Sequence, residues 1–314
     1  MVVTAFTVFI VFFIGYTLSL TLYTLTMMTI RKYRKTFNSS FYLLYLWDSA
    51  MNIFTCLTGF YMMRLNTVVS DDSMLAFLYR DIGENKYLPM NLFTALSYHM
   101  AYVQYTTTAL ISFNRMTVNW KNERFERYWM KYTWLIMAFV LLAPLADTLR
   151  FVNYKTDVVY DNETESYEFV PSMPLADTFT FLLPYMVVIT VLSVCFNICS
   201  AVLIKKFDST LSKKGSTRFM VITAITCIVQ LLGCSLSLIR VNKTENSFAR
   251  FLTTYILPIV SDALTHIQPF LLTIFSSVIR RHMMEMLGLR KSNKVNVNTI
   301  AMHVNNPSLT SHPL

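Results

Sequence analysis

Charged residues, glycine and proline are all scarce in this chain of 314 residues. Charged side chains make up 14% of it, whereas soluble domains have about 25%. Six glycines and nine prolines are too few for a fibrous or flexible chain, and 24 phenylalanines are too many for a disordered one. These shortages exclude soluble, collagen-like and disordered proteins. Because 54% of the residues are hydrophobic, we expect an integral membrane protein.

Cysteine is missing from the segments where an extracellular disulfide framework would form. The five cysteines all lie within long apolar stretches: Cys56, Cys195, Cys199, Cys227 and Cys234. A cysteine in such a stretch usually behaves as a small apolar side chain. We therefore expect no extracellular disulfide bonds.

Seven long apolar runs take up most of the chain. A helix needs about 20 residues to cross the hydrocarbon core, and lipid-facing backbone must be helical to satisfy its own hydrogen bonds. The runs cover residues 2–30, 41–63, 92–113, 132–149, 179–204, 219–239 and 251–278. The predicted fold class is an all-α membrane protein, a seven-transmembrane helix bundle formed by residues 1–281.

Two segments follow the last run. Residues 280–291 place Met283, Met286 and Leu287 between basic ends, a pattern typical of an amphipathic helix on a membrane surface. Residues 292–314 are rich in Asn and Ser, and we expect them to form a disordered cytoplasmic tail.

The distribution of charge orients the bundle in the bilayer. Most of the 27 Lys and Arg residues fall on the side that holds the C-terminus, and most of the 18 Asp and Glu residues fall on the other side. The positive-inside rule then places the N-terminus outside and the C-terminus in the cytoplasm. The net charge of +9 is thus an orientation signal, and no nucleic-acid partner is expected. Asn162 and Asn242 begin Asn-X-Thr triplets in outer connections and are candidate glycosylation sites.

Seven helices with short basic inner connections are the plan of a G-protein-coupled receptor, but two other functions are compatible with them. A secondary transporter of a small solute is the alternative, although it usually contains an internal repeat, and we find none. A membrane-embedded metal hydrolase is less favoured. Asp262 and His266 are spaced to hold a metal, but His99, Asp48 and Asp262 would have to complete the set from spans at different depths. We predict no enzyme activity, catalytic residue, metal or cofactor.

The inner end of the third run carries Asn114 and Arg115. An arginine at a helix end often only anchors the helix in the lipid interface. In a seven-helix receptor, however, an arginine at this point commonly caps the groove that receives the G protein. Asn114 stands where an acid often precedes that arginine. We predict that both residues serve G-protein coupling and that the resting state lacks the usual local ion pair.

Five stretches resemble one receptor family. They are YHMAYVQ at 98–104, FNR at 113–115, PIVSD at 258–262, QPF at 268–270 and FSSVIR at 275–280. These stretches resemble the nematode serpentine chemoreceptors of the gamma class (Srg). The resemblance implies a seven-helix receptor in the plasma membrane of sensory neurons, in their cilia, that binds a small-molecule chemical ligand and activates a heterotrimeric G protein.

Polar and ionisable side chains within the runs are candidates for the ligand site, because burying them in hydrocarbon is costly. The ligand-binding candidates are Tyr98, His99, Tyr102, Asp262 and His266. By helix rise, His99 lies about 24 Å from Arg115, towards the outer third of the bundle. The alternative is that these residues only make hydrogen bonds between helices, with Asp262 and His266 pairing with each other, with His99 or with Asp48.

A second polar group lies deeper in the runs and is expected to connect the ligand site to the inner end. It consists of Asp48, Gln104, Gln268 and Pro269. Asp48 and Gln268 are expected to meet across the bundle, and the alternative is a single hydrogen bond that packs two helices. The outer connections at 64–90 and 150–177 are long and acidic, and they either form a lid or remain solvated.

Overall fold

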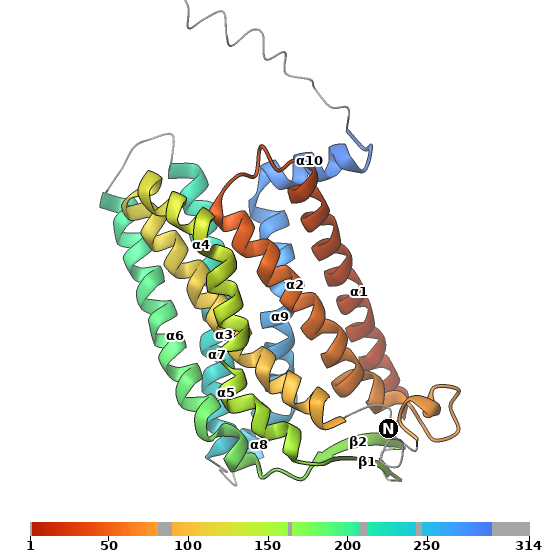
Figure 1. Ribbon diagram of the computed structural model, residues 1–314. Coiled ribbons are helices and arrows are strands. Elements are labelled where there is room, and N and C mark those ends of the chain that lie inside the picture. Colours follow the sequence, from red (N-terminus) through yellow and green to blue (C-terminus); the bar gives the residue numbers. More distant parts are fainter. Residues whose placement is uncertain (1, 81–89, 163–164, 207–212, 243–246, 291–314) are drawn as a thin grey trace, which may run out of the picture.

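The protein is a bundle of long helices, shown here by a computed structural model that describes residues 2–80, 90–162, 165–206, 213–242 and 247–290. The long helices run side by side (Figure 1). A short β-hairpin lies at the end that holds the N-terminus, and a short helix, α10, lies across the opposite end. We call these the outer and the inner end, after the predicted orientation. The proposed tail at 292–314 lies outside the described residues.

Each predicted apolar run coincides with a long helical segment. The long helices are α1 (Val2–Lys32), α2 (Ser40–Phe60), α3 (Met90–Trp120), α4 (Asn122–Leu142), α6 (Leu175–Lys206), α7 (Lys213–Val241) and α9 (Leu257–Phe275). The short ones are α5 (Leu145–Thr148), α8 (Ser247–Phe251) and α10 (Ser277–Met286). Within the described part of the chain, five segments are long and apolar enough to cross a membrane: Phe9–Lys32, Arg124–Asn153, Ala176–Lys206, Thr217–Val241 and Leu257–Phe275.

The two long helices outside that set, α2 and α3, are the ones that carry the most buried polar side chains. α3 contacts α2, α4, α6 and α7, so most of its surface faces protein instead of lipid. A helix surrounded by other helices can keep polar residues as long as they find partners inside the bundle. The buried polar residues of α3 therefore reflect its central position.

Several helix boundaries differ from the predicted runs. The fourth run was expected to continue to 149, but α4 ends before Pro144, which lacks an N–H donor, and the short α5 follows. The seventh run was expected to continue to 278, but α9 ends at Phe275. Ser276 leaves the helical conformation there, and its Oγ accepts a hydrogen bond from the Ile279 N–H at 3.3 Å, which starts α10.

Two π-helical turns interrupt the bundle near its outer end. η1 (Tyr61–Leu65) continues α2, and η5 (Leu252–Ile256) joins α8 to α9. Three 3₁₀ turns complete the outer connections: η2 (Asn66–Val68), η3 (Ala76–Leu78) and η4 (Leu149–Asn153). Because π turns are rare and often occur at functional sites, they direct attention to the residues beside them.

The outer connections include a hairpin that the all-α prediction missed. Strand β1 (Thr156–Asp161) pairs antiparallel with β2 (Ser166–Pro171). Tyr167 of the hairpin stacks on Tyr79 at 5.5 Å between ring centroids, and Tyr79 stacks on Tyr61 at 5.1 Å. The hairpin therefore packs on the other outer connection, and the two form a structured layer that we call the outer lid.

Charged contacts add to the outer lid. The Asp71 carboxylate accepts hydrogen bonds from the Tyr167 hydroxyl at 2.6 Å and from Arg80 Nε at 2.9 Å. These contacts hold the pKa of Asp71 below its usual range, the Tyr167 hydrogen bond contributing most. Asn66 donates to the Tyr167 carbonyl at 2.9 Å, which joins the hairpin to the end of α2. Of the two expectations for these connections, ordered packing against the bundle is the one observed in their described parts, residues 64–80, 150–162 and 165–177.

Candidate functional site

A partly buried ion pair lies in the outer half of the bundle, beside the π turn η1. Arg64 of η1 places Nη2 at 2.5 Å from Oδ2 of Asp262 on α9. The Tyr16 hydroxyl of α1 donates to the other carboxylate oxygen at 2.9 Å, and the Phe12 ring lies 4.0 Å from the guanidinium carbon. The side chains of Arg64 and Asp262 are 15% and 17% exposed. Three segments far apart in sequence thus converge on Asp262.

His266, one turn further along α9, belongs to the same cluster. Its ring lies 4.2 Å from the ring of Tyr16, and its Nδ1 is 3.4 Å from the sulfur of Cys56. Its other ring nitrogen, Nε2, is buried without a hydrogen-bond partner among the described residues, and so is Nε of Arg64. We call Tyr16, Arg64, Asp262 and His266 the outer ionic cluster. It keeps two nitrogen atoms available for a further partner.

The ligand-binding candidates on α3 contact the segment formed by α5 and η4. His99 is buried, with Nδ1 at 3.0 Å from the Thr148 hydroxyl of α5, a contact of the kind expected for a residue that only joins helices. Tyr98 stacks on Phe151 at 4.9 Å. The Tyr102 hydroxyl donates to Asp147 at 2.7 Å, and Arg150 pairs with the same carboxylate at 2.8 Å.

The five ligand-binding candidates therefore form two groups, one on each side of the outer half. Among the described residues, no hydrogen bond or ring contact joins His99 or Tyr98 to Asp262 or His266. The two sides still approach one another, because Tyr102 of α3 and Leu264 of α9 share one hydrophobic cluster with residues of α6 and α7.

Three of the four residues predicted for the polar core, Asp48, Gln104 and Gln268, lie in one hydrogen-bonded network. The Asp48 carboxylate accepts hydrogen bonds from Thr107 at 2.8 Å and from Asn52 at 2.9 Å, and Gln268 lies beside it. The Gln104 amide donates to Asn52 and to Thr265, each at 2.9 Å. These bonds link α2, α3 and α9, so the alternative of a single hydrogen bond does not describe the network.

Pro269, the fourth residue, contributes because it has no backbone N–H donor. A proline in a helix has no N–H for the carbonyl four residues earlier, which here belongs to Thr265. The Tyr23 hydroxyl of α1 donates to that carbonyl at 2.7 Å. Because Pro269 leaves the Thr265 carbonyl without a helical donor, the hydrogen bond from Tyr23 can join α1 to α9. This bond lies next to the Gln104 contact with the Thr265 side chain.

The inner end holds a second buried arginine, Arg115, which is 7% exposed. Its Nε and Nη2 donate to the amide oxygen of Asn114 at 3.1 and 2.7 Å. The rings of Phe41 and Phe219 lie 4.7 and 5.3 Å from its guanidinium carbon. Phe41 belongs to α2 and Phe219 to α7, so the Arg115 side chain connects three helices. We call Phe41, Arg115 and Phe219 the inner clamp.

The carboxylate that acts on Arg115 comes from α4. Glu126 accepts hydrogen bonds from the Ser40 backbone N–H at 2.5 Å and from its hydroxyl at 2.7 Å. Asn114 donates to that same hydroxyl at 2.8 Å. Glu126 therefore acts on Arg115 through Ser40 and Asn114, and the pair has no direct contact in the described structure. The role predicted for Asn114 in the resting state stays a prediction.

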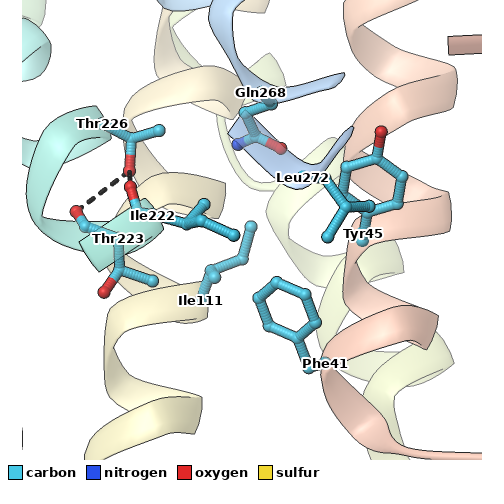
Figure 2. Close-up of a pocket in the computed structure, with 8 residues that line it drawn as sticks. All are labelled: Phe41, Tyr45, Ile111, Ile222, Thr223, Thr226, Gln268 and Leu272. Atoms are coloured by element: carbon cyan, nitrogen blue, oxygen red, sulfur yellow. Dashed lines mark hydrogen bonds between the residues drawn. The ribbon is translucent and has the colours of Figure 1, made fainter. Parts of the chain in front are cut away.

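A small cavity separates the polar core from the inner clamp. Eight residues of α2, α3, α7 and α9 line it: Phe41, Tyr45, Ile111, Ile222, Thr223, Thr226, Gln268 and Leu272. Figure 2 shows Gln268 at one side of this space and Phe41 at another. Its free volume of about 10 Å³ has room for about one water molecule and none for a ligand. The cavity is thus a packing gap between the polar core and the ring of Phe41.

The region that contains all these clusters matches known receptors. A model described as Srg family chemoreceptor matches residues 8–283. The chain belongs to the Srg family. It is also 22% identical to Serpentine receptor class gamma-31 of Caenorhabditis elegans over 276 residues, which cover 86% of this chain and 88% of that protein. The predicted resemblance is confirmed, and the protein is a multi-pass membrane chemoreceptor.

The Srg chain has functional candidates that its sequence did not reveal. Arg64 was counted as one of several basic residues at the outer side, and Tyr16 as part of an apolar run. Glu126 and Phe219 were not singled out either. An unpaired Asp262 within an apolar run was a signal that a cation had to be near, but nothing in the spacing identified which one.

Proposed function

We propose that this Srg receptor is a seven-span G-protein-coupled chemoreceptor, with its N-terminus outside and its C-terminus in the cytoplasm. It acts in the plasma membrane, in sensory-neuron cilia, where it binds a small molecule in its outer half and activates a heterotrimeric G protein at its inner end. The observation that carries this proposal is the buried Arg115, held between α2 and α7 at the end where basic residues gather.

The ligand site lies beneath the outer lid. Tyr98, His99 and Tyr102 form its α3 side, and Asp262 and His266 form its α9 side. The shared hydrophobic cluster of Tyr102 and Leu264 supports this placement, because it brings the two sides together. A ligand that changes the distance between α3 and α9 would act directly on the Gln104 contact to Thr265.

The signal passes from there through the polar core to the inner clamp. α9 carries Asp262, Thr265 and Gln268 on successive turns, so a shift of this helix reaches the outer ionic cluster and the polar core together. Phe219 lies at the inner part of α7, where it packs on Phe41 at 4.3 Å between ring centroids. Separating these rings would release Arg115 and open a groove, a two-state change of the kind that a ligand biases by differential affinity.

α10 is proposed to lie on the inner membrane surface, as residues 280–291 predicted. It buries Ile279, His282 and Met283 against the bundle. Met284 and Leu287 are 41% and 47% exposed, and Arg280 and Arg281 are exposed beside them. Exposed apolar and basic side chains on one short helix suit the boundary between acyl chains and anionic headgroups.

A reporter assay tests the function. Cells that express the receptor with a G-protein reporter are screened with volatile and water-soluble small molecules. For each active compound, we expect Arg115→Ala to abolish the response, while Arg80→Ala in the outer lid leaves it intact at equal surface expression. A compound that drives solute flux or hydrolysis without any G-protein signal would contradict the proposal. Loss of a gel shift in Asn162→Gln and Asn242→Gln after glycosidase treatment tests the orientation.

A further inference from the structure

We infer that Arg64 is the binding site for a carboxylate group on the ligand, which replaces Asp262 on the guanidinium. This inference rests on the proposed function and adds the chemical class of the ligand. It also adds Arg64 and Tyr16 to the residues of the site. The geometry of the outer ionic cluster supports it in four respects.

The first is the set of unused donors and acceptors. A buried ion pair in hydrocarbon is costly unless its remaining hydrogen-bonding atoms are satisfied. Nε of Arg64 and Nε2 of His266 are both buried and have no partner among the described residues. A pair that served stability alone would be expected to satisfy these atoms. A ligand with two acceptor oxygens can satisfy both the arginine and the histidine.

The second is the number of contacts that remain in the cluster when a ligand displaces either Asp262 or Arg64 from the ion pair. If a ligand carboxylate takes Arg64, Asp262 keeps the hydrogen bond from the Tyr16 hydroxyl at 2.9 Å. If a ligand cation takes Asp262, Arg64 keeps only the Phe12 ring, because no second carboxylate pairs with it in the described part of the chain. The cluster therefore tolerates an incoming anion better than an incoming cation. The guanidinium also binds carboxylates in a bidentate geometry.

The third is access. Arg64 belongs to the π turn η1, and η5 lies one to two turns before Asp262 on the chain. Single π turns often mark functional sites, where the backbone departs from the regular hydrogen-bond ladder. Both members of the pair are partly exposed, at 15% and 17%. The pair can thus open without unfolding either helix.

The fourth is the apolar surrounding. Phe60 packs 5.5 Å from Tyr16, and Phe9 and Phe13 pack on Phe60 at 5.8 and 6.0 Å between ring centroids. An apolar body attached to the carboxylate would meet the Phe12 ring, 4.0 Å from the Arg64 guanidinium carbon, at the edge of this aromatic group. The ligand class is therefore a small organic acid with an aliphatic or aromatic body.

A matched compound series tests the inference in the reporter assay. Straight-chain carboxylates from butanoate to decanoate are compared with the primary amides and the amines of the same length. We expect one or more carboxylates to activate the receptor with at least about tenfold greater potency than the matched amide. Arg64→Gln should remove this advantage, and Asp262→Asn should raise carboxylate potency because the competing charge is gone. Active amines with silent carboxylates, or carboxylates unaffected by Arg64→Gln, would overturn the inference.

A binding measurement separates this inference from the proposed function. The purified receptor in nanodiscs is heated with octanoate or with octanamide. Stabilisation by octanoate that Arg64→Gln abolishes supports the site even if no G protein responds. The inference would be overturned if the melting temperature were the same with octanoate as with octanamide, both in the parent receptor and in Asp262→Asn. If Arg64→Gln fails to fold, Arg64→Lys keeps the charge but loses the bidentate geometry, and unchanged octanoate stabilisation in that variant would also count against the inference.

Discussion

The two buried arginines are held in opposite ways. Arg64 in the outer half contacts a carboxylate directly, at 2.5 Å from Asp262. Arg115 at the inner end has a neutral amide, that of Asn114, and two aromatic rings, while Glu126 acts on it through Ser40. Removing one partner of a buried ion pair costs about 3–5 kcal/mol, whereas a cation–π contact contributes about 0.5–2 kcal/mol.

This difference assigns a different task to each end. Under the proposed function, a ligand carboxylate must replace the internal partner of the outer arginine, which favours selectivity for one kind of ligand. The inner arginine is held by two hydrogen bonds to the neutral amide of Asn114, a residue of its own helix, and by two aromatic rings, so separating α2 from α7 breaks its ring contacts without breaking a direct ion pair. A receptor that converts a binding event into a modest population shift needs this combination.

Replacing Asp262 should have the largest effect on stability. Asp262→Ala leaves the Arg64 guanidinium buried without a counter-ion, and we expect a loss of about 3–5 kcal/mol in the free energy of unfolding. The thermal unfolding of purified receptor in nanodiscs measures it. The double variant Arg64→Met with Asp262→Leu should recover most of this stability, because no charge remains. An Asp262→Ala receptor as stable as the parent would show that Arg64 is not held by this pair.

Gln104→Leu should have the next largest effect, because it interrupts the path between the two arginines. It leaves the acceptors of Asn52 and Thr265 without their donor, at a cost of about 1–3 kcal/mol. We expect ligand binding to persist and the ligand-induced G-protein signal to fall. Ser235→Leu, on an exposed position of α7, is the matched control. If Gln104→Leu signals normally, the polar core is not the connection.

Phe219→Ala tests the weaker inner contact. It removes one ring from Arg115, which is worth about 1–2 kcal/mol, so the population of the open state should rise by about five- to thirtyfold. The readout is basal reporter activity at matched surface expression. Phe139→Ala removes an exposed ring from α4 and should leave basal activity unchanged. A fall in basal activity for Phe219→Ala would mean that this ring supports the active state instead.

The sequence predicted the inner end better than the outer end, for physical reasons. Apolar runs of about 20 residues locate membrane helices, and helix rise then sets the depth of each polar residue. Asp48 and Gln268 were therefore expected to meet, and they do. Arg115 was identified by its place at the inner end of α3. Helix geometry sets the depth of these residues because each lies on a helix, and the common plan of seven-helix receptors drew attention to Arg115.

The outer ionic cluster could not be predicted in this way. Asp262 was expected to pair with His266, His99 or Asp48, but its partner Arg64 lies on a π turn, whose direction no regular periodicity gives. The β-hairpin was missed because its strands lie in an acidic connection. The alternation of Val158 and Tyr160, and of Tyr167 and Phe169, on either side of a polar turn was the available signal.

The exposed pair of Asp71 and Arg80 in the outer lid should have the smallest effect, and it completes the comparison. Its side chains are 50% and 49% exposed, so water screens the attraction between the two charges. Hydrocarbon would not screen it. The pKa of Asp71 is lowered in the folded protein, mainly by the Tyr167 hydroxyl. Its contribution is therefore present above the ordinary pKa of an aspartate, near 3.9, and is lost only as the pH falls through the lower folded value.

Between pH 5 and pH 8, about the range in which receptor assays are run, we therefore expect no pH dependence from this pair. Asp71→Asn should leave the melting temperature and the ligand response almost unchanged, because the Tyr167 hydroxyl can still donate to the amide oxygen. Hydrogen exchange of the lid amides should rise slightly. If Asp71→Asn destabilised the receptor as much as Asp262→Ala does, exposure would not explain the difference between the two pairs, and the contrast between the inner and outer arginines would need another cause.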